Sequence, residues 1–413
     1  MDFKSFNLHP KISAGVEAAG FSLPTPIQLQ SIPKILQHRD VMGLAQTGTG
    51  KTAAFGLPIL HKLMTGQRGS VRTLVIAPTR ELAEQINESL KLLGKQSGLR
   101  SVTIYGGVGM NPQIAALKRG VEIVVACPGR LLDHIRQKTI DLRQVDTLVL
   151  DEADRMFDMG FLPDIRRIVK CLPENRQTLL FSATMPKEIR RLAQEVLTDP
   201  ETVQVDQVAP ATTVSHALYP VPHHLKIDLL LKLLEQASIE SVLVFTKTKH
   251  RAKRIGEKLD QCGYRAASLQ GNLSQSRRQA ALDGFRDGRF QVLVATDIAA
   301  RGIDVSQVSH VINVDVPDTA DSYIHRIGRT GRAARTGEAF TMVTGDDGLM
   351  VRTIERALGT PLEQRRLVDF DYEVPAPKRS EQPSRRPRPR RPNQRNAAKK
   401  AGAKLAAAKK GMK

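Results

Sequence analysis

Two short polar segments of the chain carry residue types that can bind phosphate groups. The first, Ala45–Thr52, reads AQTGTGKT. Its Gly50, Lys51 and Thr52 match the phosphate-loop pattern G-x-x-x-x-G-K-[ST], whereas Ala45 replaces the first glycine. In such a loop, backbone N–H groups surround the phosphates, the lysine reaches the β- and γ-phosphates, and the hydroxyl helps to hold Mg²⁺. An ordinary Gly/Thr turn that opens a helix is the alternative interpretation.

The second segment, Asp151–Asp154, reads DEAD and directly follows the apolar run Thr147–Leu150. Three carboxylates in four residues at the end of a strand are unfavourable unless a cation or a base role uses them. An acid at this point of a phosphate-loop enzyme holds Mg²⁺. A solvated acidic turn is the alternative, but the glycine-rich loop upstream favours a nucleotide site.

These segments must be positioned by strands and helices. Short apolar runs read as buried parallel strands at Thr73–Ala77, Val121–Ala126, Thr147–Leu150, Thr178–Phe181, Val242–Phe245, Val292–Ala295 and Val308–Val314. Helical spacing of apolar residues between them is clearest at Leu82, Ile86, Leu90 and Leu93, at Leu229 and Leu233, and at Ile255 and Leu259. Strands that alternate with helices predict a doubly wound α/β fold. The polar motifs mostly follow strands, and parallel sheets bind ligands at that edge.

The alternation stops at Asp199–Thr213, which contains Pro200 and Pro210 and shows no helical period, so we expect a linker there. The predicted division is an N-terminal domain over residues 1–206, a linker over 207–213 and a C-terminal domain over 214–375. Residues 376–413 hold 14 Lys and Arg against Glu381, which is 13 of the net charge of +20. Their Arg/Pro-rich and Ala/Lys-rich composition predicts a disordered basic tail that binds a polyanion.

Composition narrows the choice of partner and compartment. Three unpaired-looking cysteines, Cys127, Cys171 and Cys262, argue against a disulfide framework or a zinc site and fit a reducing cytoplasm. No signal-peptide core and no apolar run of about 20 residues is present, so we expect no membrane segment. The chain has no Trp and 4% aromatic residues, which favours contacts with a nucleic-acid backbone over base stacking.

Together these motifs resemble the DEAD-box RNA helicase family of helicase superfamily 2, and the short form with a basic tail is similar to the bacterial RhlE group. The likeness runs from about Phe3 to Val343, with the motifs in the family's order. The family has alanine where Ala45 departs from the general loop. The resemblance implies two tandem RecA-like domains, ATP and Mg²⁺ as cofactors, and RNA-stimulated ATP hydrolysis.

The resemblance also implies roles in the nucleotide site. Gln28, within Gly20–Gln28, would recognise the adenine edge, and Phe3, or else Phe6, would stack on the base. Asp151 and Thr52 would hold Mg²⁺, and Glu152 would orient or deprotonate the attacking water. The ATP contacts are predicted at Phe3, Gln28, Ala45, Gln46, Thr47, Gly48, Thr49, Gly50, Lys51, Thr52, Gly302 and Asp304.

Four further residues, Asp154, Ser182, Thr184 and His325, are expected to link the two domains. Arg329 and Arg332 in HRIGRTGR, three residues apart, are expected on one side of a helix as arginine fingers for the γ-phosphate. A solvated arginine-rich loop is the alternative.

Residues that match the family's RNA contacts would reach phosphates and sugars, and so would position the strand without recognising its sequence. They are Pro78, Thr79, Arg80, Gly107, Gly129, Arg130, Thr246, Gln275, Arg278, Thr296 and Arg301. Pro78–Ala83 opens a helix, where N–H groups can meet a phosphate. Cys127 stands where the family usually has threonine, which removes one hydroxyl. Ribosome-assembly or RNA-decay proteins are the partners typical of the family.

Three functions remain open at this stage. ATP and single-stranded RNA would close the two domains and part a short duplex locally. A DNA-translocating helicase is a rival that the DEAD segment and Gln28 disfavour. A nucleotide-gated RNA clamp without strand separation is the rival from another class.

Overall fold

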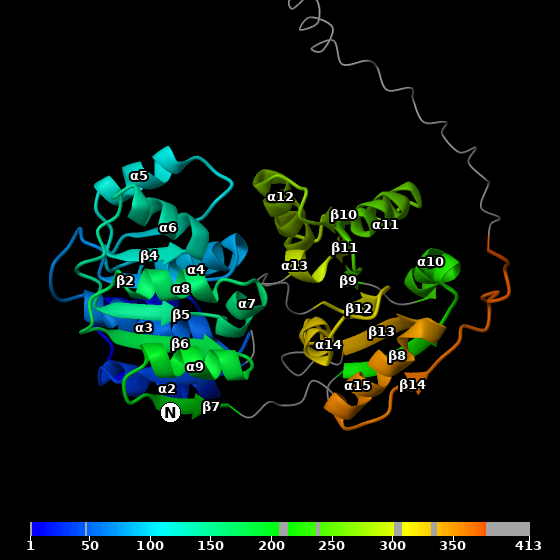
Figure 1. Ribbon diagram of the computed structural model, residues 1–413, viewed down its shortest axis with the longest axis horizontal. Helices are drawn as coiled ribbons and strands as arrows, with labels where there is room; N and C mark the ends of the chain where they lie inside the picture. The colour runs from blue at the N-terminus through cyan, green and yellow to red at the C-terminus, as the bar shows by residue number, and fades with distance from the viewer. Residues whose placement is uncertain are drawn as a thin grey trace, which may run out of the picture. The chain divides into compact units, whose positions relative to one another are not determined.

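The computed structural model describes residues 2–45, 48–205, 214–236, 240–300, 308–331 and 337–376. Within the compact unit Met1–Tyr372, the strands form two separate parallel sheets. We call the part up to residue 205 the N-lobe and the part from residue 214 to 376 the C-lobe (Figure 1). The predicted tail beyond Ala376 and the predicted linker over 207–213 lie outside the described residues.

The N-lobe sheet has seven parallel strands. Their spatial order is β3 (Ser101–Ile104), β4 (Ile123–Ala126), β2 (Thr73–Ile76), β5 (Thr147–Leu150), β6 (Gln177–Ser182), β1 (Val41–Leu44) and β7 (Glu201–Gln204). One face is covered by α1 (Pro10–Ala18), α2 (Pro26–Leu36), α3 (Lys51–Leu63) and α4 (Arg80–Leu93), and a short 3-10 turn, η1 (Phe3–Phe6), precedes them. The other face is covered by α5 (Met110–Lys118), α6 (Pro128–Arg136), α7 (Ala153–Asp158), α8 (Leu162–Val169) and α9 (Lys187–Val196).

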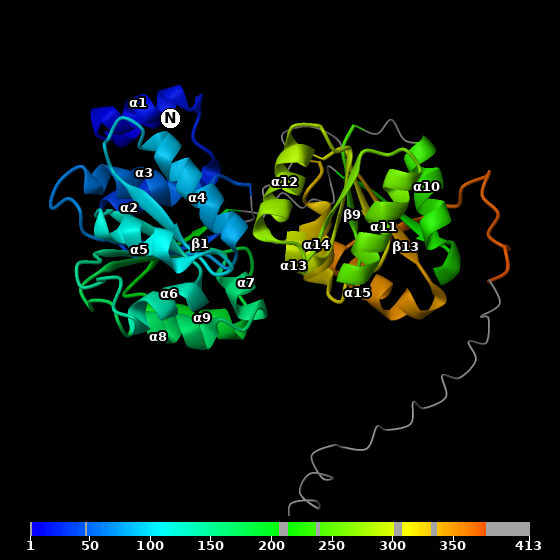
Figure 2. The ribbon, with the colours of Figure 1, turned by 90° about the horizontal axis from the view of Figure 1, so that it is seen from above.

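The C-lobe sheet also has seven parallel strands. Their order is β10 (Ala266–Leu269), β11 (Val292–Ala295), β9 (Val242–Phe245), β12 (His310–Asn313), β13 (Gly337–Val343), β8 (Val214–Pro220) and β14 (Glu363–Gln364). On one face, η3 (His223–Leu225) leads into α10 (Lys226–Gln236), and α11 (Lys249–Gln261) follows (Figure 2). On the other face lie α12 (Gln275–Arg286), α13 (Asp297–Ala300), α14 (Ala320–Ile327) and α15 (Gly348–Leu358), with η4 (Gly345–Asp347) before α15.

The two sheets share one topology. If β8 is matched to β1 and the count continues along the chain, both sheets have the same strand order. The central strands are buried along their length and mostly apolar because helices cover both of their faces. This confirms the predicted fold of two doubly wound α/β domains, and all seven predicted strands are present with ends shifted by at most a few residues.

The break in α/β alternation near Asp199–Thr213 conceals one more strand. Glu201–Gln204, inside the predicted N-terminal domain of residues 1–206, forms β7 and pairs with β1. As an edge strand it buries only Val203 fully, so its sequence shows no apolar run. An edge strand needs only one strand partner and one buried face, and for that reason hydrophobicity did not reveal it.

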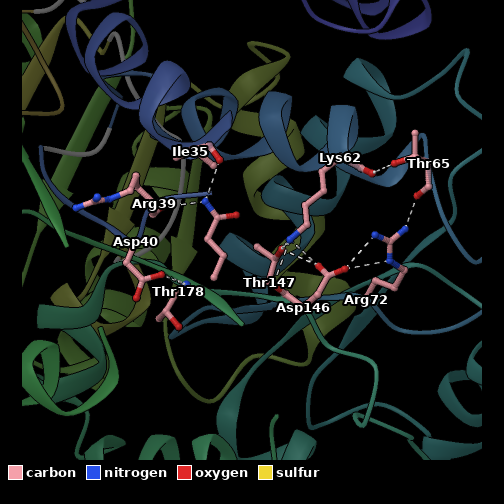
Figure 3. Close-up of polar contacts among 10 residues, drawn as sticks. Ile35, Arg39, Asp40, Lys62, Thr65, Arg72, Asp146, Thr147 and Thr178 are labelled. Atoms are coloured by element: carbon pink, nitrogen blue, oxygen red, sulfur yellow. Dashed lines mark hydrogen bonds and ion pairs between the residues drawn. The ribbon is translucent and has the colours of Figure 1, made fainter. Parts of the chain in front are cut away.

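A polar network fixes the amino-terminal ends of the N-lobe strands (Figure 3). Asp146, just before β5, accepts from Arg72 Nε and Nη2 at 3.1 and 3.0 Å and lies 3.0 Å from Lys62 Nζ. Asp40, just before β1, accepts from the backbone N–H of Thr178 at 2.7 Å. Because these groups hold the sheet at the edge opposite the polar motifs, they stabilise the site without taking part in it.

Replacing Asp146 with asparagine tests this network. Burial opposes ionisation, but the hydrogen bonds and charges of Lys62, Thr147 and Arg72 outweigh it and hold the pKa of Asp146 below its ordinary value. A lowered carboxyl pKa stabilises the fold above the unfolded-state value of about 4 and ceases to do so as pH falls through the folded-state pKa. We expect D146N to lose about 1–3 kcal/mol of unfolding free energy at pH 7. Urea unfolding measured from pH 7 to pH 3 should show the difference from wild type shrinking, and a constant difference would contradict the assignment.

Candidate nucleotide and RNA site

The phosphate loop joins β1 to α3. Gly48 and Gly50 adopt φ values of 87° and 92°, a left-handed backbone that favours glycine. Gly50 is also the N-cap of α3, and a Cβ there would lie 2.5 Å from Gln28 Nε2. Lys51 is buried at the first turn of α3, and its Nζ donates to the Ala45 carbonyl at 3.0 Å. Gln46 and Thr47 lie outside the described residues.

Gln28 connects the segment before α2 to this loop. Its Oε1 accepts from the Thr25 backbone N–H at 2.9 Å, and its Nε2 donates to the Gly50 carbonyl at 3.1 Å. The side chain is buried, and it forms a capping box with Thr25 at the start of α2. The side chain predicted to recognise adenine therefore also holds the phosphate loop in place.

The predicted stacking aromatics, Phe3 and Phe6, are both buried core residues that pack edge to face with centroids 6.0 Å apart. Phe21 is different, because 40% of its surface is exposed and its ring lies 6.0 Å from that of Phe3. It precedes Gln28 by seven residues, in the same segment. A core phenylalanine has no face free for a base, so Phe21 is the better candidate and the sequence analysis overlooked it.

The DEAD segment turns from β5 into α7. Asp151 is buried, and its Oδ1 accepts from the Glu152 N–H at 2.9 Å. Burial raises the pKa of Asp151 to about 6, although Lys51 opposes the shift. Glu152 has φ 53° and ψ 52°, a left-handed conformation that is unusual for glutamate. Its carboxylate accepts from Arg155 Nη1 at 2.8 Å in a buried ion pair.

Asp154 is bound to the predicted SAT segment. Its Oδ2 accepts from the backbone N–H of Thr184 at 2.9 Å and from the Thr184 hydroxyl at 3.0 Å, and its own N–H donates to Ser182 Oγ at 3.1 Å. Burial alone would raise the pKa of Asp154, but Lys51 and these hydrogen bonds outweigh it and hold the pKa below its ordinary value. These hydrogen bonds therefore join the DEAD turn to the segment at the end of β6.

His325, on α14, is half-buried. Burial, together with the charges of Arg155 and Arg329, lowers its pKa to about 4 against the opposing effect of Asp154. The imidazole is therefore neutral at pH 7, so it can offer Asp154 a hydrogen bond but little charge.

One expectation about the arginine fingers was wrong. Helix α14 ends at Ile327 with Gly328 as its C-cap, so Arg329 lies in the following turn and not on a helix. The Thr330 hydroxyl, which donates to the Val308 carbonyl at 2.6 Å, ties this turn to the start of β12. Arg329 itself is buried. Arg332, Gly302, Asp304 and Arg301 lie outside the described residues.

The N-lobe residues predicted to contact RNA gather at the carboxyl ends of β2, β3 and β4. Thr79 is the N-cap of α4, and its Oγ1 accepts from the Leu82 N–H at 3.3 Å. A Cβ at Gly107 would lie 2.2 Å from Arg80 Nη1, so the glycine admits the guanidinium. Arg130 Nη1 donates to the Val108 carbonyl at 3.1 Å, and Gly129 has open space beside it. Pro78 is buried between β2 and α4.

Cys127 is the N-cap of α6, but its side chain makes no capping hydrogen bond. Burial raises the pKa of its thiol to about 12, so the group is neutral. Thr296 occupies the matching place in the C-lobe, directly after β11 as Cys127 directly follows β4. The C-lobe thus keeps a hydroxyl where the N-lobe has a thiol.

In the C-lobe, Thr246 is fully buried and its hydroxyl donates to Asp315 Oδ2 at 2.7 Å. Its side chain is therefore held inside the lobe. Thr248, two residues on, is exposed and is the N-cap of α11, with its Oγ1 accepting from the Arg251 N–H at 3.2 Å. This repeats the arrangement of Thr79 on α4. The repeat of topology was the signal that would have pointed to Thr248.

Gln275 and Arg278 on α12 meet the α4 segment. Arg278 Nε lies 2.8 Å from Glu81 Oε1 in an ion pair, and Gln275 Nε2 donates to the same oxygen at 3.3 Å. Arg80 Nη1 donates to Gln275 Oε1 at 3.3 Å. Predicted RNA-contact residues from both halves of the sequence thus form one polar cluster.

Asp151 and Thr52 offer carboxylate and hydroxyl oxygens, the donors that Mg²⁺ prefers. In the part of the chain that the structure describes, no group of three or more His, Cys, Asp or Glu is placed to hold a metal ion. No helix among the described residues combines the length and apolar character needed to cross a membrane.

Two RecA-like sheets of one topology, with a phosphate loop and a DEAD turn at the carboxyl edge of the first, define a helicase-type ATPase. The DEAD/DEAH box helicase model matches residues 25–192, and the helicase conserved C-terminal domain model matches residues 225–334. The chain belongs to the DEAD-box family of ATP-dependent RNA helicases.

Similar proteins agree with this assignment. The DEAD-box ATP-dependent RNA helicase CshA of Bacillus cereus is 47% identical over 355 residues, which are 86% of this chain and 67% of that protein. CshA of Bacillus subtilis is 46% identical over 89% of this chain and 75% of that protein. The structure of S. cerevisiae Dbp5 bound to RNA and ADP BeF3 superposes with a TM-score of 0.79 at 32% identity, covering 88% of this chain and 95% of that one. The likeness to the RhlE group stays a prediction.

Substituting Phe21 tests its assignment to the base. Stacking on an aromatic ring contributes about 1–3 kcal/mol per base, so we expect F21A to raise the KM for ATP by about tenfold with little change in melting temperature. As the comparison, F3A removes a core ring and should lower stability by about 3–5 kcal/mol. A KM for ATP that stays at the wild-type value in a folded F21A protein would return the stacking role to Phe3 or Phe6.

Proposed function

We propose that the chain hydrolyses ATP at the carboxyl edge of the N-lobe sheet and uses the cycle to grip and release single-stranded RNA, parting short duplexes locally. The observation that supports this most is the junction of Asp154 with Thr184. It ties the DEAD turn, which holds Asp151 and Glu152, to the segment after β6. The phosphate loop stands beside it, because Lys51 is a main electrostatic neighbour of Asp151 and Asp154.

Each residue of this site has a task in the proposed reaction. Lys51 would leave the Ala45 carbonyl for the β- and γ-phosphates, because the charged oxygens are stronger acceptors. Bound Mg²⁺, held at Asp151 and Thr52, would neutralise charge that develops on the phosphates. Glu152 would orient the attacking water and take up its proton, once its carboxylate turns from Arg155. Arg329, with Arg332, would stabilise the transferring phosphoryl group.

RNA would be held mainly through its phosphates and sugars. The candidate groups are the α4 and α11 N-termini capped by Thr79 and Thr248, the guanidinium groups of Arg80 and Arg130, and the hydroxyl of Thr296. These groups do not distinguish bases, so we propose binding that is largely independent of sequence. Preference for RNA over DNA would come from the 2′-hydroxyls.

A reducing cytoplasm is the proposed setting, since the three cysteines are free in the structure. Ribosome-assembly or RNA-decay proteins remain the proposed partners.

The decisive assay is steady-state ATP hydrolysis with no nucleic acid, with single-stranded RNA, and with DNA of the same sequence. We expect strong stimulation by RNA alone. The E152Q protein should lose at least about 100-fold in kcat, because the amide cannot accept the proton. Equal stimulation by DNA, or none by RNA, would leave the nucleotide site in place and reject the proposed partner.

Strand separation needs its own readout. With ATP, the wild-type protein should release the labelled strand of a short RNA duplex. Under conditions that require repeated ATP hydrolysis, the E152Q protein should not release it. A protein that hydrolyses ATP and stays on RNA without releasing the strand would instead be a nucleotide-gated clamp.

We further propose that the basic tail tethers RNA. Truncation after Pro375 removes 14 Lys and Arg. It should raise the RNA concentration for half-maximal ATPase by about tenfold at moderate salt, flatten the salt dependence and leave maximal turnover unchanged. A full-length variant with every Lys and Arg beyond Pro375 changed to Gln separates charge from length and should behave like the truncation. Wild-type RNA dependence in the truncated protein would exclude tethering.

A further inference from the structure

The shared topology of the two lobes can be followed residue by residue. The Ala45 N–H donates to the Ser182 carbonyl at 3.0 Å, and the Val221 N–H donates to the Val343 carbonyl at 2.9 Å. The Asp151 N–H donates to the Ile76 carbonyl at 3.0 Å, and the Val314 N–H donates to the Phe245 carbonyl, also at 3.0 Å. Val221 therefore matches Ala45, and Val314 matches Asp151. The segment after β8 is the counterpart of the phosphate loop.

Two charged residues occupy this second site. Lys226 begins α10 as Lys51 begins α3, and both lysines are buried. Asp315, next after Val314, takes the place of Glu152. Lys226 Nζ donates to the Val314 carbonyl at 2.8 Å and lies 3.8 Å from Asp315 Oδ1. A lysine and a carboxylate thus remain where the N-lobe has its catalytic pair.

The second site cannot hold phosphates. Val221–Leu225 is one residue shorter than Ala45–Gly50, has no glycine, and contains Pro222, which lacks an N–H. Lys226 and Arg251 already have Asp315 as their anion, because Arg251 Nη1 lies 3.0 Å and Lys226 Nζ 3.8 Å from Asp315 Oδ1. Burial opposes ionisation of Asp315, but Lys247, Thr246, Arg251 and Lys226 outweigh it and hold its pKa below the ordinary value.

Asp315 connects two functional segments of the C-lobe. Its Oδ2 accepts from the Thr246 hydroxyl at 2.7 Å and from the Lys247 N–H at 3.0 Å, which fixes the loop that leads to Thr248. Its carbonyl accepts from Arg326 Nη1 at 2.7 Å. Arg326 is on α14, directly before the turn with Arg329, and also pairs with Asp297 at 2.6 Å.

We propose that Asp315, held by Lys226 and Arg251, is a positioning residue that couples the RNA-facing loop 246–249 to α14 and the arginine-finger turn. The counterpart of the phosphate loop would thus connect two functional segments of the C-lobe. When RNA engages the N-terminus of α11, this connection holds α14 in the orientation that serves ATP hydrolysis. This inference rests on the proposed RNA-stimulated mechanism and assigns it a route through buried side chains.

The test is the reciprocal coupling between RNA and nucleotide. The affinity of a non-hydrolysable ATP analogue is measured with and without saturating single-stranded RNA, and the ratio of the two is the coupling factor. We expect D315N to lower this factor at least about fivefold, to a value near one, while the affinity without RNA stays at the wild-type level. If the wild-type protein itself shows no coupling, the proposed function fails before the inference is tested.

Matched variants separate coupling from folding. D318N removes an exposed carboxylate that pairs with Lys247 Nζ, and it should leave the coupling factor unchanged. Because D315N leaves Lys226 buried without its anion, the D315N/K226M protein removes this lysine and the carboxylate together, leaves Arg251 with its contact to His223 Nε2, and keeps the test valid if D315N unfolds. The double variant should match D315N, since both changes act through one carboxylate. Wild-type coupling in a folded D315N or double variant, or an equal loss in D318N, would overturn the proposal.

Discussion

Parallel strands end at a common edge, and this constraint organises the whole molecule. Both sheets are covered by helices on both faces, so the central strands are buried and mostly apolar, and the charged motif residues lie beyond the strand ends. The carboxyl edge of the N-lobe sheet carries the phosphate loop, the DEAD turn and Thr79. The opposite edge carries the network around Asp146 and Asp40. The stabilising network and the polar motifs therefore lie at opposite ends of the same strands.

Several buried charges of the site have a partner in place. Glu152 faces Arg155, Asp154 faces the N–H and hydroxyl of Thr184, and Asp315 faces Arg251. Removing one member of a buried ion pair leaves the other charge buried without a partner, and this costs more folding free energy than the loss of an exposed pair. These pairs can also be exchanged, because a bound phosphate that takes one side chain of an ion pair frees the other side chain for a different contact.

The sequence predicted most of the fold, because buried strands between helices leave continuous apolar runs and the motifs stand directly after them. It did not predict β7, whose single buried face leaves no such run. In the candidate site, local spacing predicted the phosphate loop with Lys51, whereas the family resemblance implied the roles of Asp154 and Thr184, which are in contact in the structure. Phe21 and Thr248 were not among the predicted residues, because burial in three dimensions distinguishes Phe21 from Phe3 and the repeated topology of the two lobes is what indicates Thr248. The helix expected at Arg329 failed because Gly328 ends α14.

The match between the two lobes also bears on how many nucleotides one molecule can bind. Two lobes of one topology would bind two nucleotides if both had a phosphate loop. The turn after β8 has no glycine and is one residue shorter than the phosphate loop, and its lysine donates to the Val314 and Met342 carbonyls. The C-lobe has an internal ion pair of Asp315 with Lys226 and Arg251 at the place that corresponds to the phosphate loop and DEAD turn of the N-lobe. The repeated architecture therefore predicts one phosphate loop, and so one bound ATP, for each molecule.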